Sequence, residues 1–69
     1  MSYHIAADVG GTQLRAACYA ADSLIPIQVK RIATHANGST PLERLKTLIA
    51  SVWPPDQGVD AIGVAAPAQ

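Results

Sequence analysis

Only one stretch of this 69-residue chain has the apolar spacing of an amphipathic helix, which limits the folds open to it. Thr40 at the N-cap, Pro41 at the first helical position and Glu43 at the third favour a helix start with a capping box. Pro54-Pro55 would stop the helix, so we expect it over Pro41–Trp53. The side chains of its apolar face recur three and four residues apart: Leu42, Leu45, Leu48, Ile49 and Val52.

The segments before and after this helix have the patterns of β-strands. Tyr3–Val9 is apolar at most positions, which suits a central strand covered on both faces. Gln13–Ala20 alternates with a period of two, and so does Ile25–Lys30, where Pro26 is typical of an edge strand. Asp60–Ala66 is a short apolar run that we expect to form a buried strand.

The element order strand, strand, strand, helix, strand predicts an α/β fold with a mixed sheet. Gly10-Gly11 and Asp22 stand in turns that favour antiparallel hairpins, while a strand reached through a helix should lie parallel to the first by a right-handed crossover. Val9 and Ala66 would then share one edge of the sheet. A single helix covers only one face of four strands, so we expect a partly bare face or edge that could support homo-oligomers.

The amino-acid composition limits the classes of protein to which the chain can belong. With 49% hydrophobic and 14% charged residues the chain is not intrinsically disordered. Five basic and five acidic residues balance, which gives no reason to expect nucleic acid or an anionic membrane as a partner. Cys18, the single cysteine, cannot form an internal disulfide and suits a buried strand position in a reducing compartment. Without a signal-peptide pattern or a membrane-length apolar run, we expect a soluble, cytoplasmic protein.

The segment from Asp8 to Thr12, Asp-Val-Gly-Gly-Thr, holds the residues most suited to chemistry, at the tip of the first hairpin. Gly10 and Gly11 lack side-chain bulk, so backbone N–H groups can approach an anion and form a nest, and Thr12 adds a hydroxyl donor. Asp8 ends a strand that we expect to be buried, where a divalent cation beside a phosphate would be a natural partner. A plain Gly-Gly hairpin, with Asp8 accepting backbone N–H bonds, stays open as the alternative.

With its D-x-G-G-T core, the segment Ile5–Ala17 resembles the first phosphate motif of the sugar-kinase, hexokinase and actin-like ATPase superfamily. It looks most like the ROK family of bacterial glucokinases, N-acetylhexosamine kinases and related repressors. The element order and Ala61–Pro67 resemble the start of that family's RNase H-like N-terminal lobe, so residues 1–69 would be a partial lobe. The chain departs from the family in having Ala68 where Gly is usual, and Gln13 where Lys or Asn is usual.

The resemblance implies the phosphate-binding part of an ATP-dependent sugar kinase, which transfers a phosphoryl group to a hexose or N-acetylhexosamine hydroxyl. In the family, the residues that match Gly10, Gly11 and Thr12 contact the ATP phosphates, beside the position of Gln13. The residue that matches Asp8 helps to hold Mg²⁺. Pro67 and Ala68 match a loop near the sugar.

The family's general-base aspartate and its zinc site lie further along than this sequence extends. We therefore expect these 69 residues to have no kinase activity by themselves. The repressors carry DNA-binding helices before the motif, for which there is no room ahead of Asp8, so the enzyme branch is favoured. A non-catalytic, self-associating subdomain, and a regulator or ATPase of the same superfamily, remain the alternatives.

Overall fold

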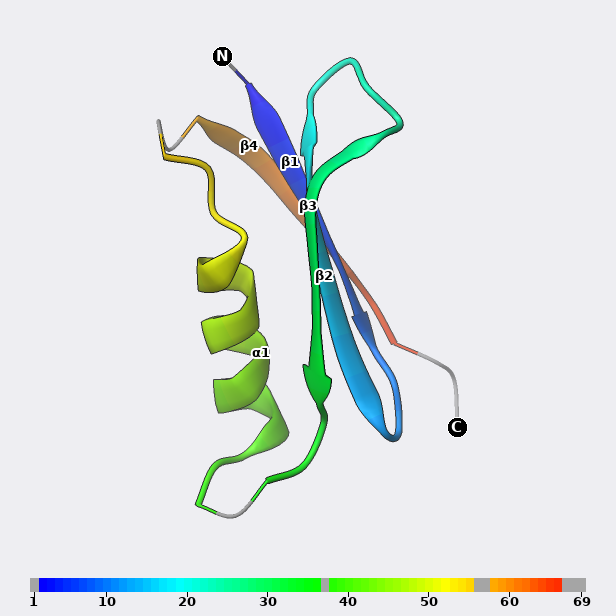
Figure 1. Ribbon diagram of the computed structural model, residues 1–69, viewed down its shortest axis with the longest axis vertical. Coiled ribbons are helices and arrows are strands. Elements are labelled where there is room, and N and C mark those ends of the chain that lie inside the picture. The colour runs from blue at the N-terminus through cyan, green and yellow to red at the C-terminus, as the bar shows by residue number, and fades with distance from the viewer. Residues whose placement is uncertain (1, 37, 56–57, 67–69) are drawn as a thin grey trace.

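The computed structural model describes residues 2–36, 38–55 and 58–66. It is a small α/β domain with one mixed four-stranded sheet and one helix, in the element order predicted from the sequence. In space the strands follow the order β3-β2-β1-β4, which differs from their order along the chain (Figure 1). The elements are β1 (Tyr3–Val9), β2 (Gln13–Ala20), β3 (Pro26–Ala33), α1 (Pro41–Ser51) and β4 (Val59–Ala65).

Strand β1 pairs antiparallel with β2 and parallel with β4, as predicted for a strand reached through a helix. Asp8 near the end of β1 is paired with Arg15 on one side and Ala65 on the other. The β1–β2 turn and the end of β4 therefore lie at the same end of the sheet (Figure 1). β3 lies at the sheet edge beside β2, which confirms the edge position that Pro26 predicted.

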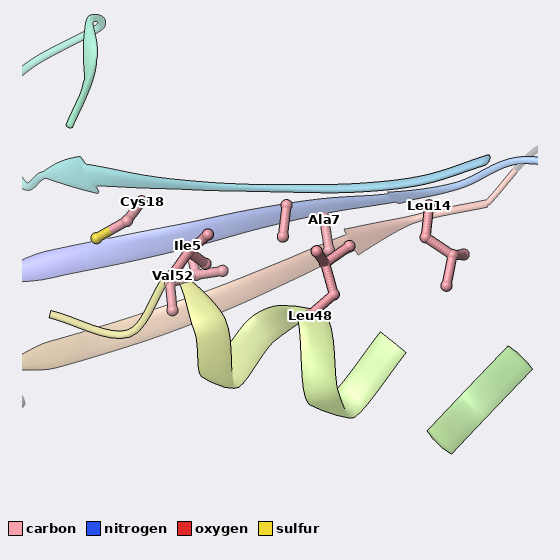
Figure 2. Packing of buried hydrophobic residues seen from close by; sticks show 7 residues of the cluster. Ile5, Ala7, Leu14, Cys18, Leu48 and Val52 are labelled. Carbon is pink, nitrogen blue, oxygen red and sulfur yellow. The ribbon is translucent and has the colours of Figure 1, made fainter. Parts of the chain in front are cut away.

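The core lies between α1 and one face of the sheet (Figure 2). Alternate residues of β1 and β2 point toward the helix because successive side chains of a strand face opposite ways. Cys18 is buried here, as the period-two pattern predicted. Fully burying a Leu, Ile or Val side chain contributes about 1.5–3 kcal/mol, so a few such residues carry much of the stability. The buried cluster is Ile5, Ala7, Leu14, Ala16, Cys18, Leu48 and Val52.

Helix α1 begins where the sequence predicts, with a complete capping box. The Glu43 N–H donates to Thr40 Oγ1 at 3.2 Å, and the Thr40 N–H donates to Glu43 Oε1 at 2.9 Å. The helix ends at Ser51, earlier than the predicted Trp53. At this end the Val52 N–H bonds the Ile49 carbonyl at 3.2 Å, a three-residue spacing that closes the last turn more tightly than an α-helix would.

Leu42 does not belong to the buried face of α1, contrary to the sequence-based prediction. The most buried side chains after the helix start are Leu48 and Val52, at 2% and 1% exposure. At 100° per residue, Leu42 projects about 100° away from the direction midway between those two residues. It is consequently 61% exposed.

Two strands are less buried than predicted. On β1, Ala6 and Asp8 are exposed, so the strand is covered on one face rather than two. No residue of β4 is buried, because β4 is an edge strand and α1 packs against β1, β2 and β3 but not against it. Ile62 and Val64 are therefore 46% and 55% exposed.

Strand β3 also runs further than predicted, to Ala33 rather than Lys30. Its residue packed against the core is Ile32, which pairs with Leu14, whereas Ile27 is exposed. An irregularity in the β2–β3 register next to Cys18 separates the first part of β3 from the regular pairing that follows. Within the residues given above, no helix is long and apolar enough to cross a membrane.

Candidate phosphate-binding loop

The turn between β1 and β2 is held from the side by Thr34, directly after β3. The Thr34 hydroxyl donates to the Gly10 carbonyl at 2.8 Å, and its N–H donates to the Thr12 carbonyl at 3.0 Å. Thr34 is 3% exposed, so a buried polar side chain finds its partner in the loop. Sequence reasoning missed this residue, because its hydroxyl partner lies 24 positions away and no local pattern marks the pair.

The two glycines of the loop serve different purposes. A Cβ atom added to Gly10 would lie 2.8 Å from the carbonyl oxygen of Gln13, whose position follows from the 2.9 Å bond that the Gly10 N–H donates to it. An added Cβ at Gly11 would meet no atom within 4 Å. Gly38 is the glycine with positive φ in the described part of the chain, so left-handed geometry is not the reason for the glycine pair. The close approach of the Gln13 carbonyl explains why residue 10 is a glycine, whereas a side chain at residue 11 would enter open space.

The loop offers free hydrogen-bond donors to solvent. The N–H groups of Gly11 and Thr12 donate to no partner in residues 2–36, 38–55 and 58–66, and both residues are exposed. The Thr12 hydroxyl is likewise available there, and Gln13 follows as an exposed residue at the start of β2. Thr34 occupies carbonyl oxygens of the loop while neighbouring N–H groups stay free. Such an arrangement suits an anion rather than a cation at the tip of the loop.

Asp8 is exposed, which corrects the expectation of a carboxylate in a buried strand. Its side chain is 60% exposed, and Arg15 Nη1 lies 3.4 Å from its Oδ2. The observed partner is therefore a cross-strand arginine rather than a backbone N–H. An exposed ion pair of this length contributes little to stability, so the carboxylate is free to exchange its partner.

A divalent cation would find only part of its ligand set at this loop. The carboxylate of Asp8 is an oxygen ligand of the type that Mg²⁺ prefers, and it is accessible. Across the described ranges, no group of three or more His, Cys, Asp or Glu side chains converges. The residues fit a Mg²⁺ ion that takes one carboxylate from the protein and its other ligands from water and phosphate oxygens.

The structure brings together five of the candidate residues at one end of the sheet: Asp8, Gly10, Gly11, Thr12 and Gln13. The two candidate sugar-loop residues, Pro67 and Ala68, lie outside the described residues. A hollow of about 250 Å³ lies elsewhere, on the helix side between β3 and α1, and no residue of the loop lines it. Its lining is Ile32, Ser39, Glu43, Arg44 and Thr47.

Comparisons of the chain with protein-family models, curated proteins and solved structures found no significant match.

Proposed function

We propose that this chain is the ATP-phosphate-binding part of an ATP-dependent sugar kinase of the ROK type, with an RNase H-like N-terminal lobe. The sugar-kinase class rests on the resemblance of the segment Ile5–Ala17 to the family's phosphate motif. One observation carries the phosphate-binding part of the proposal. Buried Thr34 donates to the carbonyl oxygens of Gly10 and Thr12, while the N–H groups of the exposed residues Gly11 and Thr12 have no partner in the described structure. A loop held in this way offers fixed N–H dipoles to a phosphate group without any further reorganisation.

Each residue of the loop has a distinct part in this proposal. The N–H groups of Gly11 and Thr12, with the Thr12 hydroxyl, would donate to the β- and γ-phosphate oxygens. The open space beside Gly11 would admit the phosphate, since nothing lies within 4 Å of the position of a Cβ there. Asp8 would hold Mg²⁺, which neutralises phosphate charge when it is bound. Gln13 would border the phosphates at the start of β2.

Binding without phosphoryl transfer is the expected behaviour of these 69 residues. A sugar kinase needs a general base at the sugar hydroxyl. Asp22 follows β2 at the opposite end from the loop, Glu43 is engaged in the capping box, and Asp60 stands at the start of β4. Asp8 is thus the one acidic side chain beside the loop within the described ranges, and it already has the proposed role at Mg²⁺.

Titration with Mg-ATP tests the proposal, with Gly11→Ala and Gly63→Ala as matched variants. Both substitutions add one methyl group where no atom lies within 4 Å, but Gly63 is in β4, away from the loop. The methyl group at residue 11 would crowd a bound phosphate, so we expect the dissociation constant to rise about tenfold in Gly11→Ala and to stay within about twofold in Gly63→Ala.

Equal affinities in the two variants, or no saturable binding by the unmodified chain, would refute a role for the loop in phosphate binding. The same samples should show no ATP-dependent phosphorylation of glucose or N-acetylglucosamine. Turnover by the 69-residue chain would contradict the proposed division between binding and catalysis.

A further inference from the structure

A row of charged side chains crosses the face of the sheet that points away from α1. Asp8 on β1 lies opposite Arg15 on β2, and Arg15 lies opposite Arg31 on β3. Residues directly across from each other share a face of the sheet. Their neighbours Leu14 and Ala16 belong to the core under α1, so the charged row lies on the other, open face.

The register brings the two arginines close together. On the β2–β3 ladder the Thr34 N–H bonds the Thr12 carbonyl, and hydrogen-bonded pairs recur at every second position of an antiparallel ladder. Arg15 and Arg31 therefore form a non-hydrogen-bonded pair, in which Cβ atoms are about 4.5–5.5 Å apart. Two like charges in this position repel each other unless an anion lies between them.

The protein supplies too little negative charge to balance this pair. Asp8 receives a single contact from Arg15, at 3.4 Å. The side chain of Arg31 forms no hydrogen bond or ion pair with any residue in the described ranges. Nε of Arg15 is covered and also has no acceptor. One carboxylate thus contacts one of the two guanidinium groups, while the Arg31 side chain and Nε of Arg15 are left without acceptors in the described ranges.

We infer that Arg15 and Arg31 form a second anion site, which binds a phosphate group on the open face of the sheet. A phosphate dianion has the charge to balance two guanidinium groups, and its oxygens match their forked donors. A turn of the Arg15 side chain toward that anion would also give its Nε an acceptor. The site uses neither the N–H groups nor the hydroxyl of the β1–β2 loop, so it does not depend on the proposed nucleotide function.

Titration with inorganic phosphate at constant ionic strength tests the site, followed by the NMR signals of the arginine Nε–H groups. Arg31→Gln removes one guanidinium from the open face. Lys30→Gln removes the same charge from the neighbouring residue, which pairs with Ala16 and so points to the helix side. We expect the dissociation constant for phosphate to rise about tenfold in Arg31→Gln and to stay within about twofold in Lys30→Gln. An equal loss of phosphate affinity in both variants would show that net charge alone explains the effect. That result would overturn the proposed site.

Two further variants separate this site from the loop. Asp8→Asn removes the competing carboxylate, so phosphate should bind the arginine pair more tightly, whereas the same change should weaken Mg-ATP binding at the loop. Gly11→Ala should leave phosphate affinity at the arginines unchanged. Loss of phosphate binding in Gly11→Ala would assign the anion to the loop and overturn the inference.

The source of the phosphate is distinguished by comparing inorganic phosphate with a phosphate monoester, glycerol 3-phosphate. Tighter, Arg31-dependent binding of the monoester would identify a phosphorylated small molecule as the ligand, and equal binding would identify free phosphate. Both results support the site. An absence of saturable shifts of the arginine signals with either probe would overturn it. Arg31→Lys keeps the positive charge but loses the forked N–H donors of the guanidinium group. This variant should bind phosphate with intermediate affinity.

Discussion

At the scale of single residues, the β1–β2 loop shows that two adjacent glycines can be present for unrelated reasons. Gly10 is required by the fold, because the Gln13 carbonyl oxygen occupies the place of a side chain. Gly11 is surrounded by open space and is not required by any neighbouring atom. Thr34 completes the loop from a distant part of the chain by bonding two of its carbonyls. Glycine content alone therefore does not identify the residue suited to ligand contact.

The two glycines should differ in their effect on folding. Gly10→Ala would place a Cβ 2.8 Å from a backbone oxygen, and such overpacking costs about 1–3 kcal/mol of unfolding free energy. Gly11→Ala should change that free energy by less than about 0.5 kcal/mol, because exposed substitutions without clashes are near neutral. Chemical denaturation followed by the fluorescence of Trp53 measures both. Equal destabilisation by the two changes would contradict the close approach at Gly10.

At the scale of elements, α1 is specified by short-range chemistry at its start. Hydrogen bonds between Thr40 and Glu43 satisfy backbone and side-chain groups reciprocally. The bond from the Thr40 backbone N–H is the larger cause of a lowered pKa for the Glu43 carboxyl, and the Thr40 hydroxyl is the next. The carboxylate also lies near the positive end of the helix dipole. The capping box should therefore depend on pH.

Acidification should weaken the start of α1. The pKa of Glu43 in the folded chain lies below its ordinary value of 4.5, so the stabilisation is complete above that value and is lost as pH falls through the folded pKa. Glu43→Gln keeps a capping side chain that does not titrate in this range. Thermal unfolding by circular dichroism between about pH 6 and pH 3 should show a steeper loss for the unmodified chain. If the stability of the unmodified chain and of Glu43→Gln changed with pH in the same way, ionised Glu43 would not contribute to the stability of the helix start.

At the scale of the whole molecule, one helix packs against three of the four strands on one face of the sheet, and the core is correspondingly small. The buried cluster contains four large side chains that are almost fully enclosed: Ile5, Leu14, Leu48 and Val52. A core in a chain below about 70–80 residues rarely supplies more than about 3–5 kcal/mol of net stability. Loss of a single large core side chain should therefore affect the whole fold.

Leu48→Ala and Leu42→Ala test this expectation as matched changes on the same helix. Leu48 is 2% exposed and Leu42 is 61% exposed. Truncation of a buried leucine costs about 2–5 kcal/mol, so Leu48→Ala should leave most of the chain unfolded. Leu42→Ala should change the free energy of unfolding by less than about 0.5 kcal/mol. Circular dichroism and denaturation report both, and a folded Leu48→Ala variant would show that the core extends beyond this cluster.

Patterns within short segments were enough to predict the elements and much of the sheet. The capping residues predicted the start of α1, and alternation along Gln13–Ala20 predicted which side chains of β2 face the core. Pro26 predicted the edge position of β3. The segment Asp8–Thr12 also marked the loop, because glycines, a hydroxyl and a carboxylate at that spacing favour phosphate chemistry. All these signals depend on local spacing, which the sequence records directly.

Tertiary structure decided what surrounds each segment. The apolar pattern of the last strand predicted that Ile62 and Val64 would be buried, but they are exposed because α1 does not pack against β4. Asp8 belongs to a largely apolar strand, yet it meets Arg15 on an open face.

The chemistry of a local motif is thus present in the sequence by itself, in the capping box of α1 and in the loop from Asp8 to Thr12. Two features of the candidate sites came only from the fold: the bonds of Thr34 to the loop and the pairing of Arg15 with Arg31. The physical reason is that burial, charge balance and long-range hydrogen bonds depend on neighbours in space. The register and the position of one helix select those neighbours.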